Sequence, residues 1–374
     1  MAAAARIDVY SHPACLRHET GEGVFEAPAS ELIAVPEKHP ENEERIANVK
    51  SILERGPLAD VIRWHGGREA KLEELLSVHT AEHVERVSVL RGTRSMIDFG
   101  DGQTRGGPHS WRAALAAAGT ARAAADGVLG GETPLAYSLT RPPGHHAAPN
   151  RIDGYCLFNN SALAAQRAID SGRQRVAIVD WDVHHGNGTQ ACFYERSDVL
   201  TISIHQDHRS WGPSHPEDGL ASELGAGAGE GYNVNVALPF GAGEGAYADS
   251  FERVVGPALE RFRPDFLIGA CGQDASQFDP NGRQCLTMSG FGAIGLAMAG
   301  HAETHVEGGR LLLCQEGGYA RTYSAYCQLA TLAGVLDVDP GIADPLGSPY
   351  AEAGVHGAAI EAAERVLGRI AADG

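Results

Sequence analysis

One stretch of the chain decides the fold and the chemistry that we expect of it: Val176-Ala-Ile-Val-Asp-Trp-Asp-Val-His-His-Gly-Asn-Gly-Thr-Gln190. A short apolar run, residues 176–179, passes abruptly into Asp180, Asp182 and His184 and then into glycines. Because unpaired charge is costly to bury, carboxylates and imidazoles at the end of a buried strand need a partner or a ligand. Residues two apart in a strand share a face, so Asp182 and His184 can point at one ion.

Short apolar runs of the same kind recur along the chain and indicate the strands of a sheet. They are rich in Val, Ile and Leu without polar alternation, which is typical of strands covered on both faces in a parallel sheet. These runs span residues 7–10, 61–64, 135–139, 199–204, 234–238, 266–271 and 311–314. Helix-like stretches lie between or after them, at residues 111–129, 161–171, 244–262, 289–306 and 355–370. The alternation predicts a doubly wound α/β domain.

The length and the long loops bear on the domain organisation. At 374 residues the chain could form one large α/β domain or two smaller ones, and we expect a single domain spanning residues 1–374. Three long loops, at about residues 15–39, 92–109 and 206–230, interrupt the pattern. Loops of this length in a compact domain are usually functional or mobile, and we expect them to shape the entrance of a site.

Composition limits the partners and the compartment. The net charge of −18 disfavours nucleic acid and anionic membranes as partners and mildly favours cationic ligands, although it could serve solubility alone. The seven cysteines are odd in number and form no Cys-x-x-Cys pair, so we expect reduced thiols in a cytoplasmic protein. No apolar run reaches about 18 residues, and we see no secretion signal. We also expect a homo-oligomer.

Polar clusters follow four of the expected strands at their carboxyl ends. They lie at residues 141–146, 180–184, 272–274 and 315–319. In open α/β sheets, ligands bind in the crevice beyond the carboxyl ends of the strands. Four strands that each deliver polar groups to that edge therefore predict one shared site.

Asp182, His184 and Asp274 together offer one neutral nitrogen and two carboxylate oxygens. Three protein ligands with an open position fit a catalytic zinc, and without a thiolate Fe(II) or Co(II) would also fit. The alternative is a hydrogen-bond network at the strand end, which would be the better interpretation of an isolated Asp-x-His. The other polar clusters favour the metal.

A histidine pair, His145 and His146, follows Pro142-Pro-Gly144 in a loop with a restricted backbone. Imidazoles held in this way suit proton transfer near neutral pH, whereas a bare His-His is more often a pair of solvated loop residues. Asp180 and Asn187 could each hold one imidazole by its far nitrogen and so set its tautomer.

A tyrosine, Tyr319, follows the tight turn that Gly317-Gly318 permits. A phenol facing the metal would stabilise an oxyanion. An ordinary half-buried tyrosine is the alternative.

The motifs that carry a family resemblance appear in one order along the chain: Arg141-Pro-Pro-Gly-His-His-Ala147, Gly154-Tyr-Cys-Leu-Phe-Asn-Asn160, Asp180-Trp-Asp-Val-His-His-Gly-Asn-Gly-Thr-Gln190, Ile202-Ser-Ile-His205, Gly231-Tyr-Asn-Val-Asn235, Gly272-Gln-Asp274 and Glu316-Gly-Gly-Tyr319. From about residue 39 to residue 319 the chain resembles the zinc-dependent histone deacetylase superfamily. Within it, the chain looks like the class II branch and its bacterial relatives, including acetylpolyamine amidohydrolases. The resemblance implies an arginase/deacetylase fold, a three-layer α/β domain with an eight-stranded parallel sheet between helices.

The resemblance also implies roles for individual residues. Zinc would lie on the Asp182, His184 and Asp274 set. His145 and His146 would form a catalytic dyad, with His146 as general base and acid, and Tyr319 would polarise the amide carbonyl. Gly154 would accept a hydrogen bond from the substrate, and Tyr155 would form one wall of the acyl channel.

A second cation site is implied beside the zinc site. A structural potassium ion would use Asp180, Ser203 and the main chain around Asp182, His184 and Ile204, and oxygen ligands suit such a hard cation.

Three further residues are candidates for contact with the substrate. Gly317 and Gly318 would lie against it, and Asp101 lies roughly where some relatives carry an acidic residue that grips the substrate backbone. Around Asp101, however, the sequence does not align cleanly.

The chain departs from its relatives at several positions. Gln273 stands where many carry an aromatic or apolar residue, and Gln315 replaces an apolar residue before Glu316. Asn187 replaces a second carboxylate, so His146 would lack a charged partner. In the variable tract, His208 and Trp211 could reshape the channel mouth.

These observations favour a zinc-dependent amidohydrolase that hydrolyses an N-acyl amide to a carboxylate and an amine. Acetyl-lysine in protein, an acetylated polyamine and a small amide all remain open as substrates. One alternative is a ureohydrolase of the arginase fold, which would need two metals and additional ligands. Another is a non-catalytic acyl-lysine binder, although none of the expected catalytic residues is lost.

Overall fold

A computed structural model describes residues 6–24, 27–28, 30–131, 134–208, 219–347, 354 and 356–370. Its centre is an eight-stranded sheet with the strand order β11-β10-β9-β12-β13-β8-β1-β5, in which every neighbouring pair is parallel. The strands are β1 (Ile7–Ser11), β5 (Ile62–Gly66), β8 (Leu135–Leu139), β9 (Val176–Asp180), β10 (Val199–Gln206), β11 (Asn233–Leu238), β12 (Phe266–Cys271) and β13 (Leu311–Gln315). Each expected apolar run is one of these strands, and the eight-stranded parallel sheet is confirmed.

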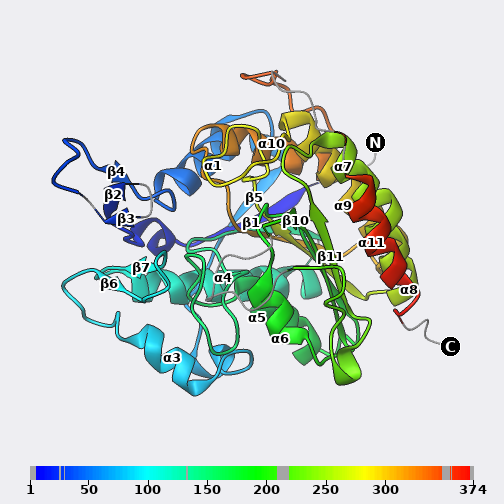
Figure 1. Ribbon diagram of the computed structural model, residues 1–374, viewed down its shortest axis with the longest axis horizontal. Coiled ribbons are helices and arrows are strands. Elements are labelled where there is room, and N and C mark those ends of the chain that lie inside the picture. The colour runs from blue at the N-terminus through cyan, green and yellow to red at the C-terminus, as the bar shows by residue number, and fades with distance from the viewer. Residues whose placement is uncertain are drawn as a thin grey trace.

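Helices cover both faces of the sheet (Figure 1). On one face lie α4 (Ser110–Gly130), α5 (Asn160–Asp170) and α6 (Asn187–Phe193). On the other lie α1 (Glu44–Arg55), α7 (Glu244–Ser250), α8 (Gly256–Phe262), α9 (Met288–His305), α10 (Tyr323–Val335) and α11 (Gly357–Leu367). The three layers expected of an α/β fold are therefore present.

The side chains of β9 explain why the strands lack polar alternation. Val176 and Ile178 pack into the apolar cluster under α4 and α5, whereas Ala177 and Val179 pack into the cluster on the opposite face. Successive residues of a strand point to opposite faces, so a strand covered on both sides must be apolar throughout. The apolar run ends before Asp180, because Asp180 is the last residue of β9 and lies where the carboxyl ends of the parallel strands meet the loops.

Some helices differ from the expectation. The stretch 244–262 forms one continuous helical path, but a π-helical segment, η4 (Phe251–Val255), separates α7 from α8. Pro257 lies in the first turn of α8 and has no N–H to donate to the preceding turn, which gives a physical reason for the change of register. Helices α1, α6 and α10, together with α2 (Leu72–Leu75) and α3 (Ala81–Ser88), were not expected.

The loops expected to be irregular contain short regular elements. Residues 15–39 overlap a 3-10 helix, η1 (Pro13–Arg17), and include a small antiparallel sheet of β2 (Glu22–Val24), β3 (Ala27–Pro28) and β4 (Glu37–Lys38). Residues 92–109 include a hairpin of β6 (Ile97–Asp98) and β7 (Arg105–Gly106). The remaining short elements are η2 (Ala59–Val61) and η3 (Gly227–Gly229).

Other expectations concern the chain as a whole. All seven cysteines are unpaired thiols, as expected. Within the described ranges, none of the helices has both the length and the apolar character needed to span a bilayer. Trp211 and the middle of the 206–230 loop lie outside the described residues. The expectation of one domain over residues 1–374 stays a prediction.

Candidate active site

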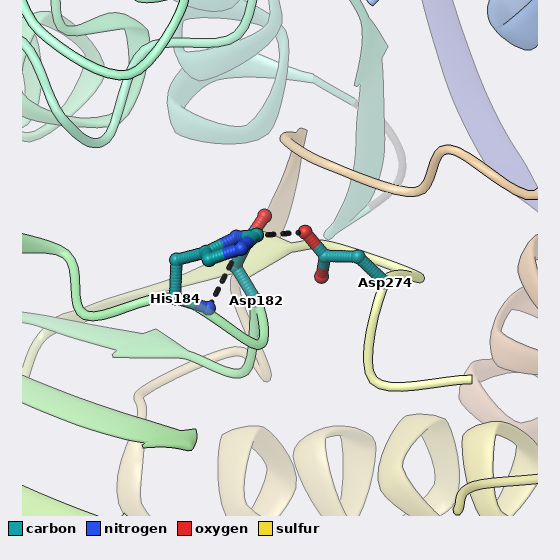
Figure 2. Close-up of side chains that lie close together, drawn as sticks. All are labelled: Asp182, His184 and Asp274. Carbon is teal, nitrogen blue, oxygen red and sulfur yellow. Dashed lines mark hydrogen bonds and ion pairs between the residues drawn. The ribbon is translucent and has the colours of Figure 1, made fainter. Parts of the chain in front are cut away.

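The four polar clusters meet because their strands are neighbours. Strands β9, β12, β13 and β8 are consecutive in the centre of the parallel sheet, so their carboxyl ends share one edge. Figure 2 shows the side chains of Asp182, His184 and Asp274 pointing toward one another at this edge. One potential ligand atom from each of the three lies within 4.8 Å of the others. The ring Nδ1 of His184 is 3.0 Å from Asp182 Oδ1 and 3.2 Å from Asp274 Oδ2.

Backbone donors orient both carboxylates of this cluster. The N–H of His184 donates to Asp182 Oδ1 at 3.0 Å, and the N–H of Gly317 donates to Asp182 Oδ2 at 2.7 Å. The N–H of Val183 donates to Asp274 Oδ1 at 2.8 Å. The positions of the ligand atoms are therefore set by the chain path itself.

The donor set of this cluster fits a divalent cation. Asp182 and Asp274 are fully buried, and they share one imidazole, that of His184. Burial and the nearby charge of Asp182 raise the pKa of Asp274 to about 7. Burial lowers the pKa of His184, but its contacts with Asp182 and Asp274 outweigh burial and raise that pKa to about 10. Two buried carboxylates that converge on one imidazole thus need a compensating positive charge, which a bound metal would supply in place of the proton. Two oxygens and one nitrogen with a fourth position open suit Zn(II), and Fe(II) or Co(II) as well.

Gly317 leaves room for this cluster. A Cβ atom added there would lie 2.1 Å from Asp274 Oδ2 and 2.5 Å from Asp182 Oδ2. Any side chain at this position would therefore displace the carboxylates. Gly317 and Gly318 are not among the described residues that line the cavity, and their contact with a substrate stays a prediction.

The two histidines of the expected dyad lie side by side, with ring centroids 3.9 Å apart. His145 Nδ1 lies 2.9 Å from Asp180 Oδ2, and His146 Nδ1 lies 2.7 Å from Asn187 Oδ1. The Asn187 amide donates from Nδ2 to Asp153 Oδ2 at 2.9 Å, which turns its oxygen toward His146. Since an amide oxygen only accepts, His146 carries its proton on Nδ1, which makes Nε2 the basic nitrogen of the ring.

The groups around the two histidines shift their pKa values in opposite directions. Burial alone would lower the pKa of His145, but the carboxylates of Asp182 and Asp180 outweigh it and raise that pKa. Burial lowers the pKa of His146, and the nearby His145 and His184 lower it further. The dyad therefore pairs a ring that favours the protonated form with one that favours the neutral form.

A buried glutamate, Glu316, holds the loop that carries the dyad. One carboxylate oxygen accepts from the backbone N–H of Gly144 at 2.6 Å and of His145 at 3.1 Å, and the other accepts from Ser161 Oγ at 3.0 Å. The sequence motif contained Glu316 without giving it a role. Its contacts join the loop after β13 to the loop after β8.

Tyr319 is buried and held from three sides. Its backbone N–H donates to Asp279 Oδ2 at 2.6 Å, and the N–H of Ala320 donates to the same oxygen at 2.9 Å. The guanidinium of Arg45 lies 4.5 Å from the centre of the phenol ring. The ring of Tyr155 meets it edge-on at 5.6 Å. Burial raises the pKa of the Tyr319 phenol above its ordinary value, so the group stays a proton donor.

Arg45 also fixes the backbone before Tyr319. Its guanidinium donates to the carbonyl oxygens of Gly318 and Glu316, each at 2.7 Å, and to Glu41 Oε1 at 2.8 Å. Arg141 donates to the same Glu41 oxygen at 2.8 Å. Burial alone would raise the pKa of Glu41, but Arg141 and Arg45 lower it to about 2.

A cavity of about 160 Å³ opens onto the site. Its described lining residues are Gln103, His146, Gly154, Tyr155, His184, His208, Pro280, Asn281, Arg283 and Tyr319. Gln103 comes from the 92–109 loop and His208 from the 206–230 loop. Both loops therefore contribute to the described lining, whereas the 15–39 loop does not, and the role of the three loops at the entrance stays a prediction.

The walls of this cavity are closely packed. Gly154 has a φ of +49°, and a Cβ atom there would lie 2.3 Å from the ring of His146, so the position requires glycine. His208 stacks on His184 with ring centroids 5.6 Å apart. Asn281 Nδ2 donates to the hydroxyl of Tyr155 at 3.1 Å, which fixes that ring as a wall.

Asp101 lies outside the described lining of the cavity. Its carboxylate accepts from the backbone N–H groups of Gln103 and Thr104, at 3.0 and 2.7 Å, and from the Thr104 hydroxyl. Thr104 Oγ1 in turn accepts from the N–H of Tyr155 at 2.9 Å. In this structure Asp101 supports the channel wall, and direct contact with a substrate stays a prediction.

The residues of the expected potassium-type site are adjacent. Ser203 and Asp180 are register partners in the pairing of β10 with β9. Asp180 Oδ1 accepts from the N–H of Asp182 at 3.0 Å, and Ser203 Oγ accepts from that of Gly186 at 3.3 Å. The potassium ion itself stays a prediction.

Comparison with known proteins gives a consistent picture. Residues 39–335 match the sequence model of the histone deacetylase domain. The chain is 48% identical to "Histone deacetylase 8" of Arabidopsis thaliana over 344 residues, which are 91% of each protein. It is 40% identical to the "Histone deacetylase-like amidohydrolase" of Pseudomonas aeruginosa over 339 residues, 89% of this chain and 86% of that protein.

Two further likenesses concern substrate and fold. The "Acetylpolyamine amidohydrolase" of Burkholderia pseudomallei is 42% identical over 243 residues, 63% of this chain and 67% of that protein. The crystal structure of the HDA15 HD domain superposes with a TM-score of 0.83 at 31% identity, covering 98% of this chain and 95% of that one. The arginase/deacetylase fold and the resemblance stated from the motifs are thus confirmed.

The metal cluster generates a binding prediction. We expect the zinc-loaded protein to be more stable than the metal-free protein by about 2.7 kcal/mol when free zinc exceeds its Kd about 100-fold. Asp182→Ala should remove most of this gain, because it takes away one of the three converging ligands. The gain is measured by denaturant unfolding at fixed free zinc. Asp98→Ala, at an exposed carboxylate paired with Arg105, is the control and should keep the whole gain. An unchanged gain in Asp182→Ala would contradict the ligand set.

The Glu41 cluster generates a pH prediction. The pKa of Glu41 is about 2 in the folded protein against an ordinary value of 4.5, so its contribution is complete above pH 4.5 and is lost as the pH falls toward 2. Glu41→Gln should therefore cost about 3 kcal/mol near neutral pH, because it leaves Arg141 and Arg45 without their buried counter-charge. Denaturant unfolding of both proteins from about pH 7 to about pH 3 should show the difference shrinking. A constant difference would show that the Glu41 charge contributes nothing.

Proposed function

The chain belongs to the histone deacetylase family, and from that premise we propose that it is a zinc-dependent amidohydrolase that cleaves an N-acyl amide into a carboxylate and a free amine. Membership makes it a hydrolase acting on amide bonds. The observation that carries the finer proposal is the convergence of the metal-ligand cluster with His146 and Tyr319 on one small cavity.

Each residue of the site has a task in this reaction. Asp182, His184 and Asp274 would hold the zinc ion, which when bound would supply a Lewis acid for the amide carbonyl and for water. His146 accepts the proton of the attacking water at Nε2, because its Nδ1 is committed to Asn187. Water oxygen bonds to the carbonyl carbon, the C–N bond breaks, and the amine leaves with a proton from the dyad.

Tyr319 and His145 have roles that concern the charge of the reacting groups. The Tyr319 phenol donates to the carbonyl oxygen, where negative charge develops as water attacks. The ring is held between Arg45 and Tyr155, and this packing would limit its motion before the substrate binds. His145, paired with the Asp180 carboxylate, would keep its proton and so leave proton transfer to His146.

The charge around the cavity bears on the substrate. Arg283 is the one permanently charged side chain among the described lining residues. It disfavours a second positive charge close to the amide, as an acetylated polyamine would bring. We propose acetyl-lysine and small uncharged amides as substrates in preference to acetylpolyamines, despite the net charge of −18 on the whole chain.

The alternatives lack support from specific contacts. A binuclear ureohydrolase needs a second group of metal ligands, and the described part of the chain holds one such group. A non-catalytic acyl-lysine binder would not need His146 and Tyr319 in the cavity, yet both line it. We further propose a cytoplasmic homo-oligomer that binds neither nucleic acid nor membranes.

A substrate panel tests this proposal. The zinc-loaded protein is assayed on an acetyl-lysine peptide, acetylspermidine and a small N-acetyl arylamine, with the release of free amine as the readout. We expect turnover of the first and third substrates and a lower kcat/KM for acetylspermidine. Turnover of none of them would contradict the function, and a preference for acetylspermidine would contradict the role of Arg283.

The Tyr319→Phe variant distinguishes the contribution of the phenol hydroxyl to turnover from the contribution of the metal. The variant should lower kcat by about 100- to 1,000-fold, because it removes one donor to the developing oxyanion. It should keep the stability gain on zinc binding, since no ligand atom is lost. Asp182→Ala, by contrast, should lose both turnover and the gain. Full activity of Tyr319→Phe would refute the assigned role.

A further inference from the structure

Three buried glutamines lie directly behind the loops that carry Asp274 and Tyr319. Gln273 and Gln315 are each 1% exposed, and Gln328 is fully buried. A primary amide is costly to bury unless its donor and acceptor are bonded. Three such side chains in one place therefore need compensating contacts.

The three side chains form a hydrogen-bonded series that begins at Tyr137 of β8. The Tyr137 hydroxyl donates to Gln315 Oε1. Gln315 Nε2 donates to Gln273 Oε1 at 2.9 Å, and Gln273 Nε2 donates to Gln328 Oε1 at 2.7 Å. We call Tyr137, Gln315, Gln273 and Gln328 the amide ladder. It crosses from β8 past the ends of β13 and β12 to helix α10.

The ladder also bonds the backbone of both loops. Gln315 Nε2 lies 3.0 Å from the carbonyl oxygens of Glu316 and Gly317. The backbone N–H of Gln273 donates to the Gly317 carbonyl at 3.2 Å, and Gln273 Nε2 donates to the Cys271 carbonyl at 2.9 Å. The loop after β12 is thereby fastened to the loop after β13.

Both fastened loops carry the reacting groups. Asp274 directly follows Gln273, and Tyr319 is the fourth residue after Gln315. Gly317, held by the ladder through its carbonyl, donates its N–H to Asp182 Oδ2. The ladder residues are not among the described residues that line the cavity, so they can act only through these neighbours.

We propose that the amide ladder is a positioning device that holds the Tyr319 loop in register with the Asp274 loop, so that turnover depends on it and substrate binding does not. The proposal rests on the amidohydrolase function proposed above. A displacement of about 1 Å between catalytic groups can cost about 100-fold in rate, and outer partners of metal ligands are worth about 10- to 100-fold.

The test uses Gln273→Leu, Gln315→Leu, the double variant and Gln328→Leu in the zinc-loaded full-length protein. For an acetyl-lysine peptide, the double variant should lower kcat by about 10- to 100-fold and change KM by less than about threefold. Hydrogen exchange of residues 316–320 should become faster in the same variant. Because removing both partners of a buried hydrogen bond is less destabilising than removing one, the double variant should recover part of the thermal stability that each single variant loses, without recovering kcat.

Thr331→Val is the matched control. Thr331 is fully buried on the same helix as Gln328, and its hydroxyl donates to the Cys327 carbonyl at 3.0 Å. The control should lose some stability but keep the wild-type kcat and exchange rate. A folded double variant with wild-type kcat and wild-type exchange at residues 316–320 would overturn the proposal.

Two further results have a defined meaning. If the double variant does not fold, Gln328→Leu, at the far end of the ladder, decides by the same two criteria. If the wild-type protein hydrolyses no amide, the proposed function fails, and the exchange measurement alone still decides whether the ladder holds the loop.

Discussion

Two carboxylates with no exposure to water, those of Asp182 and Asp274, are the constraint around which the rest of the site is built. Their charges cannot be hydrated, so they need fixed donors and a cation. The structure supplies the donors from the backbone, through the N–H groups of Val183, His184 and Gly317. Backbone N–H groups can reach these carboxylates only if the loops that carry them keep one conformation. The contacts that hold the surrounding loops together meet this requirement.

Three kinds of contact hold these loops, at increasing distance from the site. Closest to the site, Glu316 joins the dyad loop to the loop after β13 through charge-assisted hydrogen bonds. Further out, Arg45 and Arg141 share the Glu41 carboxylate, and Arg45 bonds the carbonyls before Tyr319. Neutral amides connect the same loops from behind. Charged and neutral contacts thus converge on one short segment, residues 316–320.

The sequence predicted those parts of this arrangement that depend on local pattern. The strand runs are apolar on both faces because helices cover both faces, and this property is visible in each run separately. The convergence of Asp182, His184 and Asp274 with the histidine pair could be predicted because each group follows its strand directly, and parallel strands end at the same edge. Asp180 and Asn187 were predicted as partners of His145 and His146, and the contacts confirm this.

The sequence could not predict partners that only the tertiary fold brings together. Arg45 bonds the Gly318 carbonyl across 273 positions, and no periodicity marks it. Asp279 looks like a turn residue, although its carboxylate holds the backbone at Tyr319. Helix α10 was not expected because its residues are buried on nearly all sides, which leaves no amphipathic pattern. The role of Asp101 depended on the contacts of Thr104, which the sequence does not reveal.

The amide ladder has a direction as well as a position. Tyr137 donates to Gln315, Gln315 and Gln273 each accept at the oxygen and donate from the nitrogen to the next member, and Gln328 accepts at the end. The dipoles of the three amides therefore add, and each bond polarises the one after it. Neither Gln315 nor Gln273 can rotate its amide by half a turn without placing donor against donor on one side and acceptor against acceptor on the other. The reversed series is excluded as well, because the carbonyls of Glu316, Gly317 and Cys271 need the amide nitrogens that face them. The ladder therefore has one self-consistent orientation and behaves as one cooperative unit, so the two loops that it joins cannot loosen one contact at a time.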